Sequence, residues 1–191
     1  MSKSCLLCGV GGQGTVLAAK IIAAAAMEKG LKVHSAETIG MAQRGGSVVS
    51  HVRMGNNVHS PLIPLHTADV IISFEPAEAV RNLPYLKEGG VLITAKKAVK
   101  PVTSSLGGDS YTGDEMLEYL EQNVPNLCVV DGDIICTKLG SPRVLNVVLL
   151  GAALKSGVLG FTADEIEKVL RKRLPEKFHE INIKALRGLP D

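Results

Sequence analysis

Two glycine-rich segments hold the residue types in this chain that are best suited to binding an anionic ligand. In the first, residues 9–14 read Gly-Val-Gly-Gly-Gln-Gly and separate an apolar run from an alanine-rich helical pattern. In that setting a Gly-x-Gly-x-x-Gly motif allows a tight turn and lets the backbone approach a phosphate, which the next helix N-terminus attracts. Glu37, at the end of the next predicted strand, has the place of the ribose-binding acid of dinucleotide folds. The motif therefore indicates either a dinucleotide site or a strand-to-helix turn with no ligand of its own.

The second glycine-rich segment, residues 40–46, reads Gly-Met-Ala-Gln-Arg-Gly-Gly and lies where a dinucleotide fold usually continues into a helix. It combines the amide of Gln43, the fixed positive charge of Arg44 and a flexible backbone. An arginine in this setting can pair with a carboxylate or a phosphate through two parallel hydrogen bonds. It can equally form an ion pair at a subunit interface, and the sequence leaves both roles for Arg44 open.

The cysteine and acid spacings do not predict a metal site or a nucleophile. Cys5 and Cys8 lie on one predicted strand, where residues three apart point to opposite faces and cannot bind the same ion. Asp131 and Asp133 follow another strand, and such residues cap turns or helices more often than they bind cations. The chain has no metal-binding histidine motif, P-loop motif or Gly-x-Ser-x-Gly motif. All four cysteines are expected to be buried, reduced thiols: Cys5, Cys8, Cys128 and Cys136.

The composition is that of a globular protein and disfavours several classes of partner. The 191 residues carry a formal net charge of +2, contain 3% aromatic residues and include no tryptophan. A nucleic-acid binder usually has a strongly basic face, so we expect no nucleic-acid partner. No run reaches the roughly 18 apolar residues that a membrane span needs, and the N-terminus does not resemble a signal peptide. We therefore expect no membrane partner and a cytoplasmic location.

Strand patterns alternate with helical patterns along the chain, which indicates a largely parallel sheet. Thr162 and Glu165 have the spacing of a helix capping box. The sequence predicts one three-layer, Rossmann-like α/β domain over residues 1–191, with a mostly parallel sheet, helices on both faces and a helical C-terminal part from about residue 142. The predicted strands are 4–8, 31–36, 47–54, 68–74, 90–95 and 127–130; the main predicted helices are 15–29, 77–86, 114–123, 143–155 and 176–186.

Taken together, residues 9–14 and 40–55 resemble the gamma-type domain shared by the 2-oxoacid:ferredoxin oxidoreductases. The Met-Ala-Gln-Arg-Gly-Gly version at residues 41–46 resembles the beta subunits of the indolepyruvate branch of this family. The run Asn-Val-Val-Leu-Leu-Gly-Ala at residues 146–152 also fits the family pattern, and the resemblance extends over nearly the whole chain.

The resemblance implies one subunit of a complex that oxidatively decarboxylates aryl 2-oxoacids such as indolepyruvate with coenzyme A. The products would be an aryl-acetyl-CoA, CO2 and reduced ferredoxin. A larger alpha subunit would hold thiamine diphosphate and iron–sulfur clusters, and this chain, binding no cofactor alone, would support the active site and assembly. The alternatives are a free-standing NAD(P)- or flavin-binding Rossmann-type oxidoreductase and a binding module without catalysis.

No catalytic residue and no metal ligand is predicted in this chain. Residues 9–14 could contact the phosphates of coenzyme A or only shape the edge of the sheet, and Arg53 is expected to serve packing or an interface pair. The candidate ligand-contacting residues are Gly9, Gly11, Gly12, Gln13, Gly14, Gln43, Arg44, Gly45 and Gly46.

Overall fold

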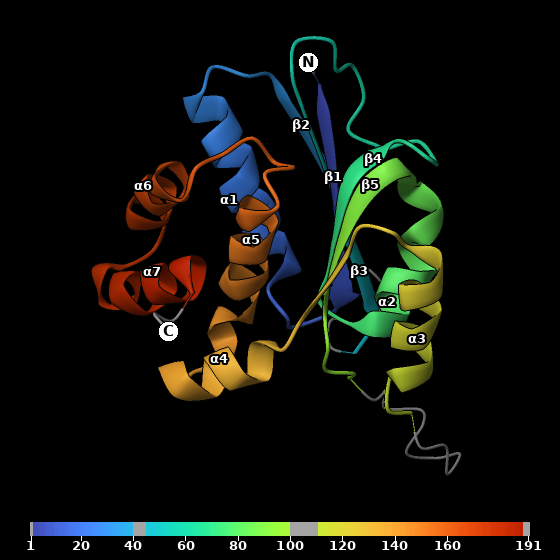
Figure 1. The fold of residues 1–191 in the computed structure, drawn as a ribbon. Helices are drawn as coiled ribbons and strands as arrows, with labels where there is room; N and C mark the ends of the chain where they lie inside the picture. The colour runs from blue at the N-terminus through green and yellow to red at the C-terminus, as the bar shows by residue number, and fades with distance from the viewer. Residues whose placement is uncertain (1, 40–44, 100–110, 189–191) are drawn as a thin grey trace.

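The fold is built on a single mixed sheet (Figure 1). A computed structural model of the chain describes residues 2–39, 45–99 and 111–188. These residues form a six-stranded sheet in the order β2-β3-β1-β4-β5-β6. The strands are β1 (Lys3–Val10), β2 (Val33–Ile39), β3 (Ser47–Met54), β4 (Ala68–Ser73), β5 (Leu86–Ala95) and β6 (Leu127–Val130).

Five of these six strands run in the same direction, and the antiparallel strand β3 lies among them. β1 pairs in parallel with β4, β4 with β5 and β5 with β6, whereas β3 is antiparallel to both β1 and β2. The chain between β2 and β3 is too short for a crossover helix, so β3 turns back beside β2. The predicted, mostly parallel sheet is confirmed. The insertion of β3 between β1 and β2 was not predicted.

Helices cover both faces of the sheet, as predicted (Figure 1). Two separate clusters of buried side chains fill the space between the layers, and successive residues of β1 alternate between them. Cys5 belongs to the cluster under α1 and α5, while Cys8 belongs to the cluster under α2 and α3. The first face carries α1 (Thr15–Glu28), α4 (Gly132–Leu139), α5 (Leu145–Lys155), α6 (Ala163–Arg173) and α7 (His179–Arg187); the second carries α2 (Pro76–Asn82) and α3 (Asp114–Asn123).

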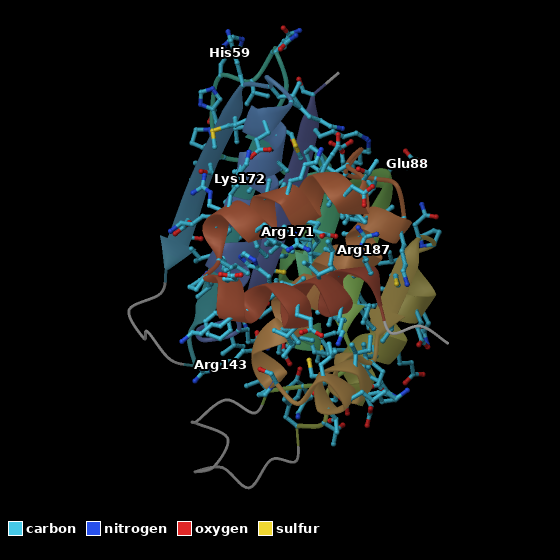
Figure 2. All side chains as sticks on the ribbon, turned by 90° about the vertical axis from the view of Figure 1, so that its left-hand side faces the viewer. His59, Glu88, Arg143, Arg171, Lys172 and Arg187 are labelled. Atoms are coloured by element: carbon cyan, nitrogen blue, oxygen red, sulfur yellow. The ribbon has the colours of Figure 1, made fainter. Side chains whose placement is uncertain are left out.

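The C-terminal part forms the outer helices on the α1 face (Figure 2). A short 3-10 turn, Pro142–Val144, leads into α5. The predicted capping box at the start of α6 is present, with the Thr162 hydroxyl accepting from the Glu165 amide and the Glu165 carboxylate accepting from the Thr162 amide. Arg187 of α7 donates to Glu167 of α6 at 2.6 Å, which joins the two helices at their exposed surface.

The cysteine prediction is correct for three residues and wrong for the fourth. Cys5, Cys8 and Cys136 are buried, whereas Cys128 is exposed, and all four are free thiols. Cys128 lies on β6, the last strand of the sheet, where no further strand covers the edge. Within the described ranges, no helix combines the length and the apolar character that crossing a bilayer requires.

Candidate functional site

The candidate site lies at the carboxyl ends of β1 and β4. After β1 the chain forms α1 on one face of the sheet, and after β4 it forms α2 on the opposite face (Figure 1). Neighbouring parallel strands whose helices lie on opposite faces leave a crevice between their ends, which is the usual ligand position in α/β sheets. Residues 9–14 border this point directly.

The described end of the second glycine-rich segment, residues 45–46, lies beside the first segment at this edge. The amide of Gly11 donates to the carbonyl oxygen of Gly46 at 2.8 Å. Gly45 has a positive φ of 80° and is exposed. Gln43 and Arg44 fall outside the described residues. The structure thus brings Gly46 of the second segment into contact with Gly11 of the first.

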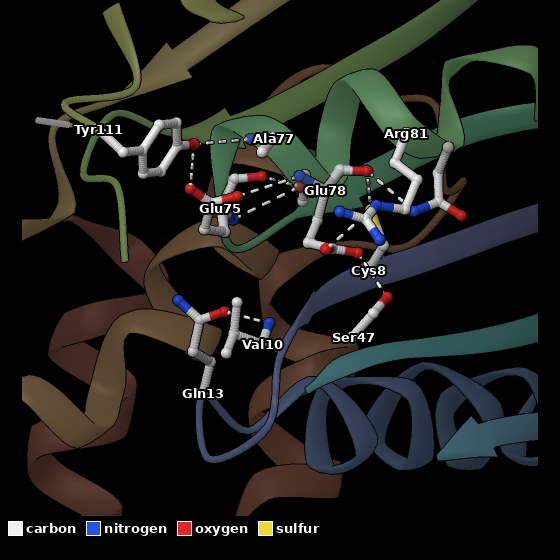
Figure 3. A network of polar contacts seen from close by, with 11 residues as sticks. Cys8, Val10, Gln13, Ser47, Glu75, Ala77, Glu78, Arg81 and Tyr111 are labelled. Carbon is white, nitrogen blue, oxygen red and sulfur yellow. Dashed lines mark hydrogen bonds and ion pairs between the residues drawn. The ribbon is translucent and has the colours of Figure 1, made fainter. Parts of the chain in front are cut away.

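Within the first segment, Gln13 and Gly9 support the loop from inside. The Gln13 Oε1 atom accepts from the Val10 amide at 2.7 Å (Figure 3). The Gln13 Nε2 atom donates to the Phe74 carbonyl at 2.8 Å. A Cβ atom on Gly9 would come within 2.8 Å of the Phe74 Cβ. The side chain of Gln13 therefore connects β1 to the end of β4, and only a glycine at position 9 allows that approach.

The first turn of α1 offers unpaired donors next to the loop. Its N-cap residue, Gly14, has a φ of 84° and supplies no side-chain cap, and the turn contains no acidic residue. The amide of Ala18 is the first to bond within the helix, to the Gly14 carbonyl. The three preceding amides have no intrahelical acceptor, and among the described residues the buried Thr15 hydroxyl also has no partner. Such an N-terminus attracts negative charge.

An open groove of about 550 Å³ runs beside this turn. Leu17 and Val48 give it apolar walls, and Leu17 is 36% exposed. Lys20 is its one charged lining residue within the described ranges, and no ion pair of Lys20 occurs there. The groove suits a ligand with an anionic group at the α1 terminus and an uncharged extension. Its lining comprises Val10, Gly11, Gly12, Gly14, Thr15, Val16, Leu17, Lys20 and Val48.

The first turn of α2, on the other side of the crevice, has the opposite character because its donors are already occupied. Glu75 is only 2% exposed and caps the helix by accepting from the Glu78 amide at 3.0 Å. The Tyr111 hydroxyl donates to Glu75 at 2.5 Å and accepts from the Ala77 amide at 3.2 Å (Figure 3). The pKa of Tyr111 is raised, mainly by burial and to a smaller extent by the hydrogen bond to Glu75. This helix terminus is therefore closed by side chains of the protein itself.

A second buried carboxylate, Glu78, faces the start of β3. It is 5% exposed and accepts a hydrogen bond from the Ser47 hydroxyl at 2.6 Å. The guanidinium of Arg81 lies 3.4 Å away on its solvent side. Beneath it, the Cys8 thiol donates to the Glu78 carbonyl at 3.5 Å. Burial raises the pKa of Cys8 to about 12, so this thiol is not a nucleophile at neutral pH.

Glu37 does not occupy the position expected of a dinucleotide-binding acid. It is exposed on β2 and pairs with Ser50 of β3, which in turn pairs with Leu7 of β1. Because β3 separates it from β1, Glu37 lies two strands away from the strand that leads into the glycine-rich loop. The geometry on which the dinucleotide interpretation depended is therefore absent from the described residues.

The two acidic residues that directly follow β6 in the sequence prediction make ion pairs at the surface. Asp131 lies 3.5 Å from Lys96, and Asp133 lies 2.7 Å from Lys97. The described residues contain no group of three His, Cys, Asp or Glu side chains that could hold a metal ion.

Sequence reasoning missed three features of this edge. They are the free amides of the first turn of α1 with the Thr15 hydroxyl, the charge of Lys20, and the two acids at the start of α2. A signal existed for the last, because Glu75 precedes Pro76 and Glu78 follows three residues after Glu75, a pattern typical of a capped helix start. No local signal links Tyr111 to Glu75, since the two residues are distant in sequence and meet only through the tertiary fold.

Comparison with known proteins assigns the chain to a family. Residues 4–188 match the family described as pyruvate ferredoxin/flavodoxin oxidoreductase. The chain is 39% identical to indolepyruvate oxidoreductase subunit IorB of Archaeoglobus fulgidus, covering 98% of this chain and 93% of that protein. It is 36% identical to the protein of the same name from Pyrococcus horikoshii, with 94% and 90% covered.

A solved structure agrees with this assignment. The gamma subunit of a keto/oxoacid ferredoxin oxidoreductase from Geobacter sulfurreducens superposes with a TM-score of 0.70 at 25% identity. The superposition covers 98% of this chain and 93% of that one. The family resemblance seen in the two glycine-rich segments is thus confirmed. The chain belongs to the pyruvate ferredoxin/flavodoxin oxidoreductase family, as a gamma-type subunit of a 2-oxoacid:ferredoxin oxidoreductase complex.

Proposed function

We propose that the complex acts on aryl 2-oxoacids such as indolepyruvate and uses coenzyme A to give an aryl-acetyl-CoA, CO2 and reduced ferredoxin. Support for this substrate class comes from the relatives named for indolepyruvate, which match over nearly the whole chain. A larger alpha subunit in the cytoplasm carries thiamine diphosphate and iron–sulfur clusters, which supply the decarboxylation chemistry and the route for electrons. This chain is not catalytic alone.

The role we assign to this chain is to bind the phosphates of coenzyme A at the first turn of α1. The observation that carries this proposal is the set of free amides beside a groove lined by Lys20, together with the Thr15 hydroxyl, which has no partner in the described part of the chain. Free amides at a helix N-terminus bind phosphate oxygens well. The apolar groove wall formed by Leu17 and Val48 then accommodates the uncharged arm of the same molecule.

The glycine-rich segments serve this site in two ways. Gly12 keeps a side chain away from the ligand, because a Cβ there would extend into open space with nothing within 4 Å. The second segment, with Gln43, Arg44, Gly45 and Gly46, supplies the charge of Arg44, which pairs either with a phosphate of the ligand or with a carboxylate at a subunit interface.

The test is an anaerobic assay of the assembled complex. The chain is co-purified with its larger partner, and oxoacid-dependent reduction of a viologen dye is followed at varied coenzyme A concentrations. We expect Lys20→Ala to raise the KM for coenzyme A about fivefold to tenfold while leaving the KM for indolepyruvate unchanged. Lys172→Ala is the matched control, because Lys172 is an exposed cation on the outer face of α6 (Figure 2).

Two outcomes would contradict the proposal. A chain that purifies alone, or a complex without oxoacid turnover, would contradict the assignment of substrate and partner. An Arg44→Ala variant with unchanged assembly, coenzyme A dependence and oxoacid dependence would show that neither role assigned to Arg44 is correct.

A further inference from the structure

A closed ring of contacts joins residues 11–13, residues 46–47 and the first turn of α2. Figure 3 shows the bond of this ring between Ser47 and Glu78. The Glu78 carboxylate accepts a hydrogen bond from the Ser47 hydroxyl. Gly46 directly precedes Ser47, and its carbonyl oxygen accepts from the Gly11 amide. Two residues later, the Gln13 side chain donates to the Phe74 carbonyl, and the chain continues from there into α2 and back to Glu78. Each loop is thus held to the other both directly and through α2.

The bond between Glu78 and Ser47 is the one side-chain contact in this ring that involves a charged group. A hydrogen bond to a carboxylate is shorter and about twice as strong as one between neutral groups, and its 2.6 Å length fits that class. Glu78 is almost fully buried, so water competes little for the bond. Arg81 compensates the charge from the solvent side at 3.4 Å without entering the ring.

Neither acid of this turn is free to bind an external ligand. Glu75 is engaged by Tyr111, by the Glu78 amide and by the Val99 amide, and the Ala77 amide is occupied by Tyr111. The contacts of Glu78 are directed at Ser47, a residue that begins β3 immediately after the second glycine-rich segment. The acid therefore acts on the position of the chain rather than on a ligand.

We propose that Glu78 is a positioning residue: through Ser47 it fixes the distance between residues 45–46 and residues 11–14, and so sets the width of the ligand site at the α1 terminus. This inference rests on the proposed function for its activity measurement, but its structural part does not. Within the described residues, loss of the Glu78–Ser47 bond leaves the Gly11–Gly46 backbone bond as the hydrogen bond between the two loops, next to the end of the β1–β3 ladder at Val10 and Ser47.

The experiment compares Ser47→Ala, Glu78→Ala, Glu78→Gln and the double variant Ser47→Ala/Glu78→Ala in the assembled complex. We expect Ser47→Ala and Glu78→Ala each to raise the KM for coenzyme A about tenfold with little change in kcat. Glu78→Gln keeps an oxygen that accepts from Ser47 and should restore most of the affinity. The double variant should be no worse than either single variant, because both remove the same bond.

A second measurement uses the full-length chain alone and does not depend on turnover. Hydrogen exchange of the peptides covering residues 11–14 and 45–49 should become faster in Ser47→Ala, while exchange in α5 stays unchanged. The control is Ser156→Ala, which removes a hydroxyl of the same kind that donates to Ala153 at the far end of α5. Ser47→Ala removes one oxygen atom only, so it keeps the test valid even where Glu78→Ala does not fold.

Two results would overturn the inference. One is wild-type hydrogen exchange of both peptides in Ser47→Ala. The other is additive losses in the double variant, which would mean that Glu78 and Ser47 act separately. If the wild-type complex shows no dependence on coenzyme A, the proposed function fails, and the exchange measurement still decides whether Glu78 positions the loops.

Discussion

The side-chain amide of Asn146, at the start of α5, packs against Gly14, the N-cap residue of α1. A Cβ atom on Gly14 would lie 2.7 Å from the Asn146 Nδ2 atom, and Asn146 is itself buried. The helix that begins the C-terminal part of the chain therefore contacts the loop that the N-terminal strand leads into.

We predict that Gly14→Ala destabilises the chain by about 2 kcal/mol, because it adds a clash with Asn146 to the cost of a left-handed conformation. Gly12→Ala is the matched control, since Gly12 also has a positive φ but has open space where the Cβ would lie. Thermal or urea unfolding measures both. Equal losses in the two variants would show that the Asn146 contact contributes nothing.

Gln13→Glu should be more damaging than its small change in shape suggests. The substitution replaces the amide nitrogen that donates to the Phe74 carbonyl at 2.8 Å with a carboxylate oxygen, which the carbonyl repels. We expect a loss of about 2 kcal/mol in the free energy of unfolding at pH 7. The control is Gln122→Glu on the exposed side of α3, which should change stability by less than about 0.5 kcal/mol. Equal effects at the two positions would argue against the bridge that Gln13 forms between β1 and β4.

The imidazole of His51 makes part of the stability of the chain dependent on pH. Its Nδ1 atom accepts from the Ile63 amide at 3.2 Å, which requires the neutral ring, and burial lowers the pKa of His51 below 6.5. A lowered folded-state pKa means that the unfolded chain binds the proton more readily, so this contribution is complete above pH 6.5 and is lost as the pH falls below it.

The test is urea unfolding of wild type and His51→Gln between pH 7.5 and pH 5.0. We expect the wild-type free energy of unfolding to fall more steeply with acidification than that of His51→Gln. The control is His59→Gln, because His59 is exposed in the connection between β3 and β4, whereas His51 is buried on β3. Parallel slopes for wild type and His51→Gln would contradict the prediction.

Gly151 allows α5 and α7 to approach each other closely. A Cβ at this position would clash with the Leu186 carbonyl oxygen, a backbone atom that cannot rotate away. Alanine is normally the better helix residue by up to about 1 kcal/mol, yet here we expect Gly151→Ala to destabilise by about 2 kcal/mol through overpacking. Hydrogen exchange should show lost protection mainly in α7, and unchanged exchange there would count against the close approach.

Local patterns were enough to predict some parts of the structure. The capping box of Thr162 and Glu165 depends only on the geometry of one helix. The burial of Cys5 and Cys8 on opposite faces of the sheet depends only on the geometry of one strand. The strand–loop–helix setting of residues 9–14 was predicted in the same way.

Other features depend on which elements become neighbours, and these could not be predicted. The expected role of Glu37 assumed that β2 lies next to β1, and the pairing of β3 with both strands removes that arrangement. The exposure of Cys128 follows from β6 being the last strand. Gln13 looked like a ligand residue because its partner, Phe74, is brought to it only by the parallel pairing of β1 with β4.

The insertion of β3 also affects how the protein can be divided and when its ligand loop forms. In a dinucleotide fold the first strand, helix and second strand make a paired unit, but here β1 and β2 are not neighbours and have no strand partner until β3 has been synthesised. A fragment that ends after β2 therefore contains the glycine-rich loop without any sheet to hold it. As the chain leaves the ribosome, β1 must wait with both edges open until β3 has been synthesised, and with one edge open until the polypeptide has reached β4. The segment that contains β1 is therefore the one that nascent-chain chaperones would need to protect longest.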